Sequence, residues 1–314
     1  MKWEDVKTVG NIGAGTMGHA ITLQFAMKGY QVHLLDTSKE ALAHGLTLIK
    51  QDLQTFQEAG LLKENPHTIL ERISTTTDYK EALTNVDFVI ESVVEKLAIK
   101  KNIWQEVEKF IKDDTIVATN TSGLSPSAIQ KVMKHPGRFA VAHFWNPAQL
   151  MPLVEVVPGD KTDPSTIKFI IGLMNHIGKH AAPLSKEALG FVGNRIQLAV
   201  LRECFHIVNE GIASPEAVDD IVKYSLGRRW SLVGPIASAD LGGLDVFGNV
   251  SAYLYDDLAN NKGMDQVLKE KMDNNELGLK TGKGFFNWEG ETGKEIVANR
   301  DAELLELLKK DNQR

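Results

Sequence analysis

Short runs of apolar, β-branched residues alternate with segments of helical periodicity over the first 185 residues of the chain. A short apolar run bounded by turn residues predicts a buried strand, and apolar residues that recur every three or four positions predict an amphipathic helix. Strands that alternate with helices in this way favour an α/β fold, a doubly wound and mostly parallel sheet. The predicted strands are Val6–Ile12, Gln31–Leu35, Ile73–Thr76, Phe88–Ile90, Thr115–Thr119, a run that ends at His143, Leu153–Val157 and His180–Pro183.

Several of the predicted helices begin with a capping residue, and three of these have proline at the first helical position. A long helix capped by Thr37 or Ser38 is expected to end at Ala59, because Gly60 follows it. The other predicted helices are Ile21–Met27, Leu61–Arg72, Asp78–Leu83, Lys96–Phe110, one that starts at Ser125-Pro126, and one from Asp163-Pro164 to about Ile177.

The character of the chain changes after Ser185. Ala188–Glu210 is a long helical pattern, Ser214-Pro215 opens another helix, and glycine-rich joints such as Leu241–Leu244 separate further helices. We therefore predict two domains, a dinucleotide-binding domain with a helical hairpin in residues 1–185 and an all-helical substrate and dimerisation domain in residues 186–314. The apolar helices of the second domain have little sheet to pack on, which favours a homodimer formed through them.

A glycine-rich turn follows the first predicted strand directly and precedes a helix. Glycines at this spacing allow a tight turn, a close approach of the backbone to a pyrophosphate and close packing of helix on strand. Asp36 ends the second predicted strand, eighteen positions after Gly18, where a carboxylate can hold the ribose hydroxyls. No arginine follows Asp36 to receive a 2′-phosphate, so a Rossmann-type site for NAD is predicted rather than one for NADP. Its turn residues are Gly13, Gly15, Thr16, Met17 and Gly18.

Composition excludes several other classes of protein. The 314 residues are 43% hydrophobic and 24% charged, which is ordinary for a globular protein. A net charge of −6 argues against nucleic acid as a partner. No apolar run is long enough to cross a membrane, and the start of the chain is no signal peptide, so a cytoplasmic protein is expected. One cysteine, Cys204, and histidines without ligand spacing predict no disulfide framework and no metal site.

Polar residues collect where the predicted strands end, and parallel sheets bind ligands at that edge. His143 ends one strand, and a turn containing two prolines separates it from a strand with a single carboxylate, Glu155. A buried carboxylate needs a partner, and a chain that doubles back places Glu155 near His143. A histidine oriented by a carboxylate can remove the proton of a secondary alcohol during its oxidation. Ser122 and Asn194 are candidates to hydrogen-bond the reacting oxygen. Gly13, Asp36, Glu91, Ser122 and His143 all follow predicted strands.

Eight motifs follow one another along nearly the whole chain. They are Gly13–Gly18 with Asp36, Glu91–Lys101 (ESVVEKLAIKK), Asn120–Leu124 (NTSGL), His143–Pro147 (HFWNP), Leu153–Val157 (LVEVV), Gly190–Ile196 (GFVGNRI), Gly234–Asp245 (GPIASADLGGLD) and Lys280–Phe285 (KTGKGF). Together they resemble the L-3-hydroxyacyl-CoA dehydrogenase family. The resemblance implies that His143 is the catalytic base, Glu155 its partner, and Ser122 and Asn194 substrate contacts. It implies NAD contacts at Glu95, Lys100, Ser122 and Lys280, gives Glu95 more weight than Glu91, and we add Asn146.

Two departures concern the substrate. Relatives that use CoA esters usually carry lysine after the glycine of the hairpin, where this chain has Leu61, and lysine where it has Pro152. These features are similar to the branch with lambda-crystallin, L-gulonate dehydrogenase and carnitine dehydrogenase, which acts on free 3-hydroxy acids. The motif set as a whole favours short L-3-hydroxyacyl-CoA esters, with Lys50 and Lys63 as candidate phosphate contacts. A free 3-hydroxy acid is the alternative. A binding protein without catalysis is disfavoured because the catalytic set is intact.

Overall fold

The computed structural model describes residues 2–311, and its chain divides into two compact units. The first comprises the residues up to Asn194 together with those from Arg300 on, and the second comprises Arg195–Asn299. The predicted boundary after residue 185 stays a prediction. Within residues 2–311, no helix has both the length and the apolar content that crossing a bilayer requires.

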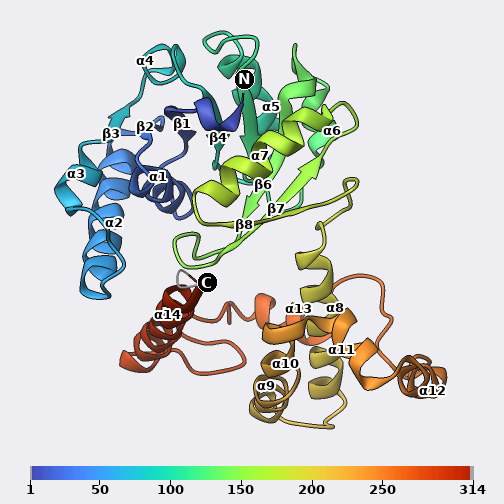
Figure 1. Cartoon of the computed structure of the whole chain (residues 1–314). Coiled ribbons are helices and arrows are strands. Elements are labelled where there is room, and N and C mark those ends of the chain that lie inside the picture. Colours follow the sequence, from blue (N-terminus) through green and yellow to red (C-terminus); the bar gives the residue numbers. More distant parts are fainter. Residues whose placement is uncertain (1, 312–314) are drawn as a thin grey trace. The chain divides into compact units, whose positions relative to one another are not determined.

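The first unit is built on one eight-stranded sheet (Figure 1). Its strand order is β3-β2-β1-β4-β5-β6-β7-β8, and all neighbouring strands are parallel except the antiparallel pair β6 and β7. The predicted doubly wound, mostly parallel fold is therefore confirmed. The strands are β1 (Thr8–Ile12), β2 (Gln31–Leu35), β3 (Ile73–Thr76), β4 (Phe88–Glu91), β5 (Ile116–Thr119), β6 (Phe139–Phe144), β7 (Leu153–Pro158) and β8 (His180–Pro183).

Helices cover both faces of this sheet and bury its alternate side chains in two clusters. One cluster packs α1, α2, α3 and α7 on the sheet, and the other packs α4, α5 and α6 on the opposite face. Because both faces are covered, the central strands are apolar almost throughout, as parallel strands are. The helices are α1 (Gly18–Met27), α2 (Lys39–Glu58), α3 (Pro66–Leu70), α4 (Tyr79–Leu83), α5 (Leu97–Val107), α6 (Pro126–Gln130) and α7 (Pro164–His176), with short 3-10 turns at Trp3–Asp5 and Pro136–Arg138.

Two predicted helices are shorter in the structure. The segment Leu61–Arg72 is helical only at Pro66–Leu70, because the Asn65 side chain caps the helix there and Pro66 takes its first position. The long helix predicted from Ala188 begins only at Gly193. Phe191, just before it, has a φ of 53°, so the chain cannot run straight through this point as a helix.

The second unit is helical, and among its described residues only isolated β-bridges near Lys283 interrupt that pattern. Helices α10, α11 and α12 bury none of their side chains, although they are rich in apolar residues. The helices after β8 are α8 (Gly193–Asn209), which starts in the first unit, α9 (Pro215–Tyr224), α10 (Leu226–Val233), α11 (Pro235–Gly242), α12 (Leu244–Leu254), α13 (Gln266–Asp273) and α14 (Glu291–Asp311), whose last turns belong to the first unit.

Candidate active site

The glycine-rich turn lies at the carboxyl end of β1, and each of its glycines has a different structural reason. Gly13 has a φ of 103°, which favours glycine. A Cβ added at Gly18 would overlap the carbonyl oxygen of Gly13, so the turn closes on the helix start with no room for a side chain. At Gly15, by contrast, an added Cβ would meet nothing within 4 Å. The open face at Gly15 and the start of α1 fit a pyrophosphate.

Asp36 closes the same site from the end of β2. Its Oδ2 accepts a hydrogen bond of 2.8 Å from the backbone N–H of Ala14, and its Oδ1 accepts one of 3.3 Å from Ser38. These bonds tie the end of β2 to the glycine-rich turn and orient the carboxylate. Asp36 is therefore placed where a carboxylate can bind the ribose hydroxyls of a dinucleotide.

A polar cluster behind the turn was missed by the sequence analysis. His19, buried in the first turn of α1, has Nδ1 3.0 Å from the carbonyl oxygen of Gly15 and Nε2 3.3 Å from Oδ2 of Asp52 in α2. Gln149, in the turn between β6 and β7, donates to the other oxygen of Asp52 at 3.1 Å. The cluster joins the glycine-rich turn to the segment that follows His143, and nothing in the local sequence pattern signals it.

His143 and Glu155 face one another across β6 and β7. They are paired residues in the antiparallel register, and Nδ1 of His143 lies 2.9 Å from Oε2 of Glu155. Both residues are buried, with 6% and 2% of their surfaces exposed. In the described part of the chain, Nε2 of His143 has no hydrogen-bond partner. The carboxylate fixes the ring and its tautomer and leaves the far nitrogen available for a proton.

Glu155 is held as an anion by its surroundings. Its Oε1 accepts hydrogen bonds of 3.0 Å from the backbone N–H groups of Val192 and Gly193, at the start of α8, where a helix favours negative charge. Burial alone would raise the pKa of Glu155, yet the hydrogen bonds from His143, Gly193 and Val192 and the charge of His143 outweigh it and lower the pKa. A carboxylate in this state can stabilise an imidazolium beside it.

Two aromatic residues enclose the histidine ring, and neither is among the predicted site residues. The ring centroids of Trp145 and Phe191 lie 5.7 Å and 5.6 Å from that of His143. Nε1 of Trp145 also donates to Oε2 of Glu155 at 3.4 Å. A Cβ at Gly193 would overlap the Trp145 ring, so glycine is required there. The turn before α8 thus packs its backbone onto the histidine and its partner.

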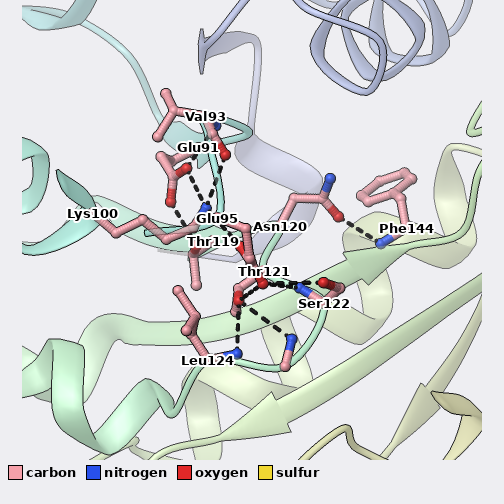
Figure 2. A network of polar contacts seen from close by, with 11 residues as sticks. Glu91, Val93, Glu95, Lys100, Thr119, Asn120, Thr121, Ser122, Leu124 and Phe144 are labelled. Atoms are coloured by element: carbon pink, nitrogen blue, oxygen red, sulfur yellow. Dashed lines mark hydrogen bonds and ion pairs between the residues drawn. The ribbon is translucent and has the colours of Figure 1, made fainter. Parts of the chain in front are cut away.

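Glu95 organises the loop that carries Ser122 (Figure 2). Its Oε1 accepts hydrogen bonds from the hydroxyl of Thr121, from the N–H of Ser122 at 2.7 Å and from the Ser122 hydroxyl at 3.1 Å. Burial alone would raise the pKa of Glu95, but the bond from Thr121, the charge of Lys100 and the bonds from Ser122 together lower it. Because the Ser122 hydroxyl donates its proton to Glu95, its oxygen faces other groups as an acceptor.

Lys100 and Glu91 lie beneath this loop, and both side chains are fully buried. Nζ of Lys100 is 2.6 Å from Oε1 of Glu91 and 3.5 Å from Oε2 of Glu95 (Figure 2). The protein covers the whole of the Lys100 surface, so the structure shows ion pairing for this residue, and the predicted NAD contact stays a prediction.

The remaining predicted residues lie in several places. Nδ2 of Asn194 donates to the carbonyl oxygen of Ser122 at 2.9 Å, which brings these two residues together. Asn146 is exposed in the turn after β6, and Lys63 is exposed after α2. Lys280 is exposed in the second unit and is described only within that unit.

A buried lysine fixes the turn between β6 and β7, and no local sequence pattern predicts it. Nζ of Lys179 donates to the carbonyl oxygens of Ala148 at 2.6 Å and Met151 at 3.0 Å. Burial, aided by the charge of Lys28, lowers the pKa of Lys179 to about 7. The turn that follows His143 is thereby tied to the start of β8.

Two family models match almost the whole chain. Residues 8–188 match the NAD binding domain of 3-hydroxyacyl-CoA dehydrogenase, and residues 190–288 match the C-terminal domain of the same enzyme. The prediction from the glycine-rich turn and Asp36 that the cofactor is NAD is therefore confirmed.

Relatives and solved structures agree with this assignment. A 5-formyl-3-hydroxy-2-methylpyridine 4-carboxylate 5-dehydrogenase of Mesorhizobium japonicum is 31% identical over 300 residues, which cover 96% of this chain and 96% of that protein. A 3-hydroxybutyryl-CoA dehydrogenase of Clostridioides difficile is 37% identical over 279 residues, 88% of this chain and 98% of that protein.

The crystal structure of a 5-formyl-3-hydroxy-2-methylpyridine 4-carboxylic acid 5-dehydrogenase, described as an NAD+ dependent dismutase, has a TM-score of 0.91 with this chain at 31% identity. The match covers 98% of this chain and 99% of that one. The fold, the glycine-rich turn and these matches over both halves of the sequence lead to one assignment. The chain belongs to the 3-hydroxyacyl-CoA dehydrogenase family and is an NAD-dependent oxidoreductase of that family.

Proposed function

We propose that this protein oxidises the 3-hydroxyl group of a short L-3-hydroxyacyl-CoA ester to the ketone, and catalyses the reverse reduction. The observation that carries the proposal is the contact of 2.9 Å between Nδ1 of His143 and Glu155, which leaves Nε2 of the histidine available. Oxidation of a secondary alcohol requires a base for the hydroxyl proton, and a histidine titrates in the range in which such a base works.

In this mechanism, His143 removes the hydroxyl proton through Nε2. Glu155 accepts the Nδ1–H, so the imidazolium that forms is stabilised by an adjacent anion. NAD, when bound, supplies the acceptor for the hydride that leaves the same carbon. The rings of Trp145 and Phe191 keep the histidine in place and limit the access of water to it.

Asn194 is the residue that we assign to the reacting oxygen. One N–H of its side chain donates to the carbonyl of Ser122, and an amide nitrogen carries a second hydrogen that can reach a ligand. Ser122 donates its own proton to Glu95, so we assign its hydroxyl oxygen to accept a hydrogen bond from a bound ligand. Of the two predicted substrate contacts, Asn194 thus acts as a hydrogen-bond donor and Ser122 as an acceptor.

The first test compares a thioester with a free acid. We expect loss of NADH on adding acetoacetyl-CoA, with a kcat/KM at least about 10²-fold above that for free acetoacetate, because binding of the remote CoA portion lowers the barrier at the reacting carbon. Lys63→Gln should raise KM for acetoacetyl-CoA, and Lys39→Gln serves as the surface control. Turnover of the free acid without turnover of the thioester would contradict the proposal.

A free hydroxy acid is the second candidate, and one feature of the hairpin favours it. Leu61 and Leu62 are partly buried and pack against the main core cluster, so the turn after α2 offers apolar side chains where a lysine would offer charge. The relative from Mesorhizobium, which matches this chain over nearly its full length, is named for a pyridine carboxylate. A panel of free 3-hydroxy acids and of that pyridine substrate with NAD tests this candidate directly.

We further propose that the protein is a homodimer formed through helices of the second unit. Large apolar side chains are exposed on α10, α11 and α12, among them Leu232 at 80%, Ile236 at 79% and Leu241 at 77%. Exposed apolar patches of this kind mark interaction sites. Light scattering behind size exclusion should give twice the chain mass of 34.7 kDa. Ile236→Asp should shift that mass toward one chain. A wild-type mass of one chain at all concentrations would refute the dimer.

A further inference from the structure

We propose that Glu91 and Lys100 are positioning residues for NAD binding: a buried ion pair that fixes Glu95 and, through Glu95, the loop at Ser122. This gives Lys100 a role through Glu95, and it gives a role to Glu91, which the family resemblance ranked below Glu95. The inference rests on the proposed function and on the predicted contacts of Glu95 and Ser122 with NAD.

The Glu91 carboxylate is fully enclosed and fully paired. Oε1 accepts from Nζ of Lys100 at 2.6 Å and from the N–H of Val93 at 2.7 Å, and Oε2 accepts from the hydroxyl of Thr119 at 2.6 Å. These donors come from the end of β4, from α5 and from the end of β5. Glu91 therefore joins three elements at the carboxyl edge of the sheet.

The ammonium group of Lys100 contacts only protein groups at this carboxyl edge of the sheet, among the described residues. Besides Glu91, Nζ lies 3.3 Å from the carbonyl oxygen of Val93 and 3.5 Å from Oε2 of Glu95. Figure 2 shows the lysine side chain running from α5 toward both carboxylates. The ammonium is thus a fixed positive charge between the buried carboxylate of Glu91 and the partly exposed carboxylate of Glu95.

Glu95 links this pair to the cofactor side of the site. One of its oxygens faces Lys100, and the other accepts both the N–H and the hydroxyl of Ser122. The Glu95 side chain is 39% exposed, so it can reach a ligand, whereas the pair behind it cannot. Removing the ammonium leaves Glu95 bonded to the Ser122 loop but takes away the charge that holds the two of them against α5.

Stability by itself is a weak reason for such a pair. Desolvation of two buried charges offsets most of their attraction, and well-packed neutral replacements are often no less stable. A buried ion pair does fix the position of a charge, because only one geometry satisfies both partners. Positioning and stability can therefore be separated by removing both charges at once.

The experiment uses Glu91→Gln, Lys100→Met and the double variant Glu91→Gln/Lys100→Met in the full chain. Each single variant leaves one buried charge without its partner, and we expect a marked fall in Tm. The double variant should recover most of that Tm. Its affinity for NADH, measured by fluorescence titration without substrate, should nevertheless be at least about tenfold weaker than that of the wild type, as displaced positioning groups cause.

A matched control lies at the opposite edge of the sheet. Arg138 and Glu108 also form a buried ion pair, with Nη2 and Oε1 3.2 Å apart. Glu108→Gln/Arg138→Met removes the same kind of pair, and we expect a change in Tm with NADH affinity within about twofold of the wild type, since ligands bind at the other edge. An equal loss of NADH affinity in this control would overturn the inference.

The outcomes separate the inference from the proposed reaction. A double variant that recovers Tm and binds NADH like the wild type overturns the positioning role. If the double variant does not fold, Glu95→Gln takes its place, and it must weaken NADH binding by at least about tenfold. Unchanged binding in Glu95→Gln overturns the inference. Failure of the proposed reaction appears instead as normal NADH binding without turnover of either substrate class.

Discussion

Replacing His143 by glutamine should lower kcat/KM by about 10²–10⁴-fold and leave the affinity for NADH close to that of the wild type. This loss corresponds to about 3–5 kcal/mol of transition-state stabilisation. The physical reason is that glutamine keeps a polar group opposite Glu155 but cannot take up the hydroxyl proton through Nε2. Steady-state rates with NADH titration of the same preparation measure both quantities.

A second histidine supplies the control for this variant. His67 lies on the surface of α3 with Nδ1 3.2 Å from a glutamate oxygen of Glu71, so it resembles His143 in its partner and differs in burial. His67→Gln should leave kcat/KM unchanged. Equal rates in wild type and His143→Gln would show that another group is the base, and a loss of NADH binding would show that the substitution disturbed the fold.

Alanine substitutions at two glycines of the cofactor turn should both abolish tight NADH binding, for different reasons. At Gly15 an added Cβ meets nothing in the protein, so Gly15→Ala should leave the Tm of the free protein unchanged. The same Cβ occupies the space in which the backbone must approach the pyrophosphate, so affinity should fall by at least about 10²-fold.

Gly18→Ala should lower the Tm of the free protein as well. Its Cβ would overlap the backbone carbonyl of Gly13, and backbone cannot yield as a flexible side chain can. Such overpacking typically costs about 1–3 kcal/mol. Gly248→Ala, at an open position within α12, is the matched control: it should leave NADH binding unchanged and should not lower the Tm, because alanine favours a helix more than glycine does. A Gly15→Ala protein that binds NADH normally would contradict the placement of the pyrophosphate.

The sheet could be predicted from the sequence because the patterns that signal its strands lie within short segments of the chain. The central strands of the first unit are apolar runs between turn residues, and each glycine of the cofactor turn stands at a fixed distance from the next. Because the central strands are buried on both faces, they are continuous apolar runs that are easy to recognise. Eight strands and the site for NAD could therefore be predicted from the order of residues. The turn with two prolines between β6 and β7 also predicted that Glu155 lies near His143. In the structure the two residues are paired in the antiparallel register.

The predictions from the sequence were wrong at two places where the backbone does not continue as a helix. The helix predicted from Ala188 starts five residues late, because Phe191 takes a left-handed conformation that brings its ring to His143. The hairpin segment Leu61–Arg72 is mostly irregular, because capping by Asn65 competes with the helical pattern around it. In both cases a contact made at a distance, or a local cap, overrides the periodicity.

By itself, the order of residues determined the fold class, the cofactor and the identity of His143 and Glu155 as partners. Only the tertiary structure decided which buried groups hold these residues in place. His19 with Asp52 and Lys179 with two carbonyl oxygens join segments far apart in the chain, and Lys100 with Glu91 ties α5 to the end of β4. Pairings of this kind leave no periodic trace, because their energy depends on distance and desolvation inside the folded protein.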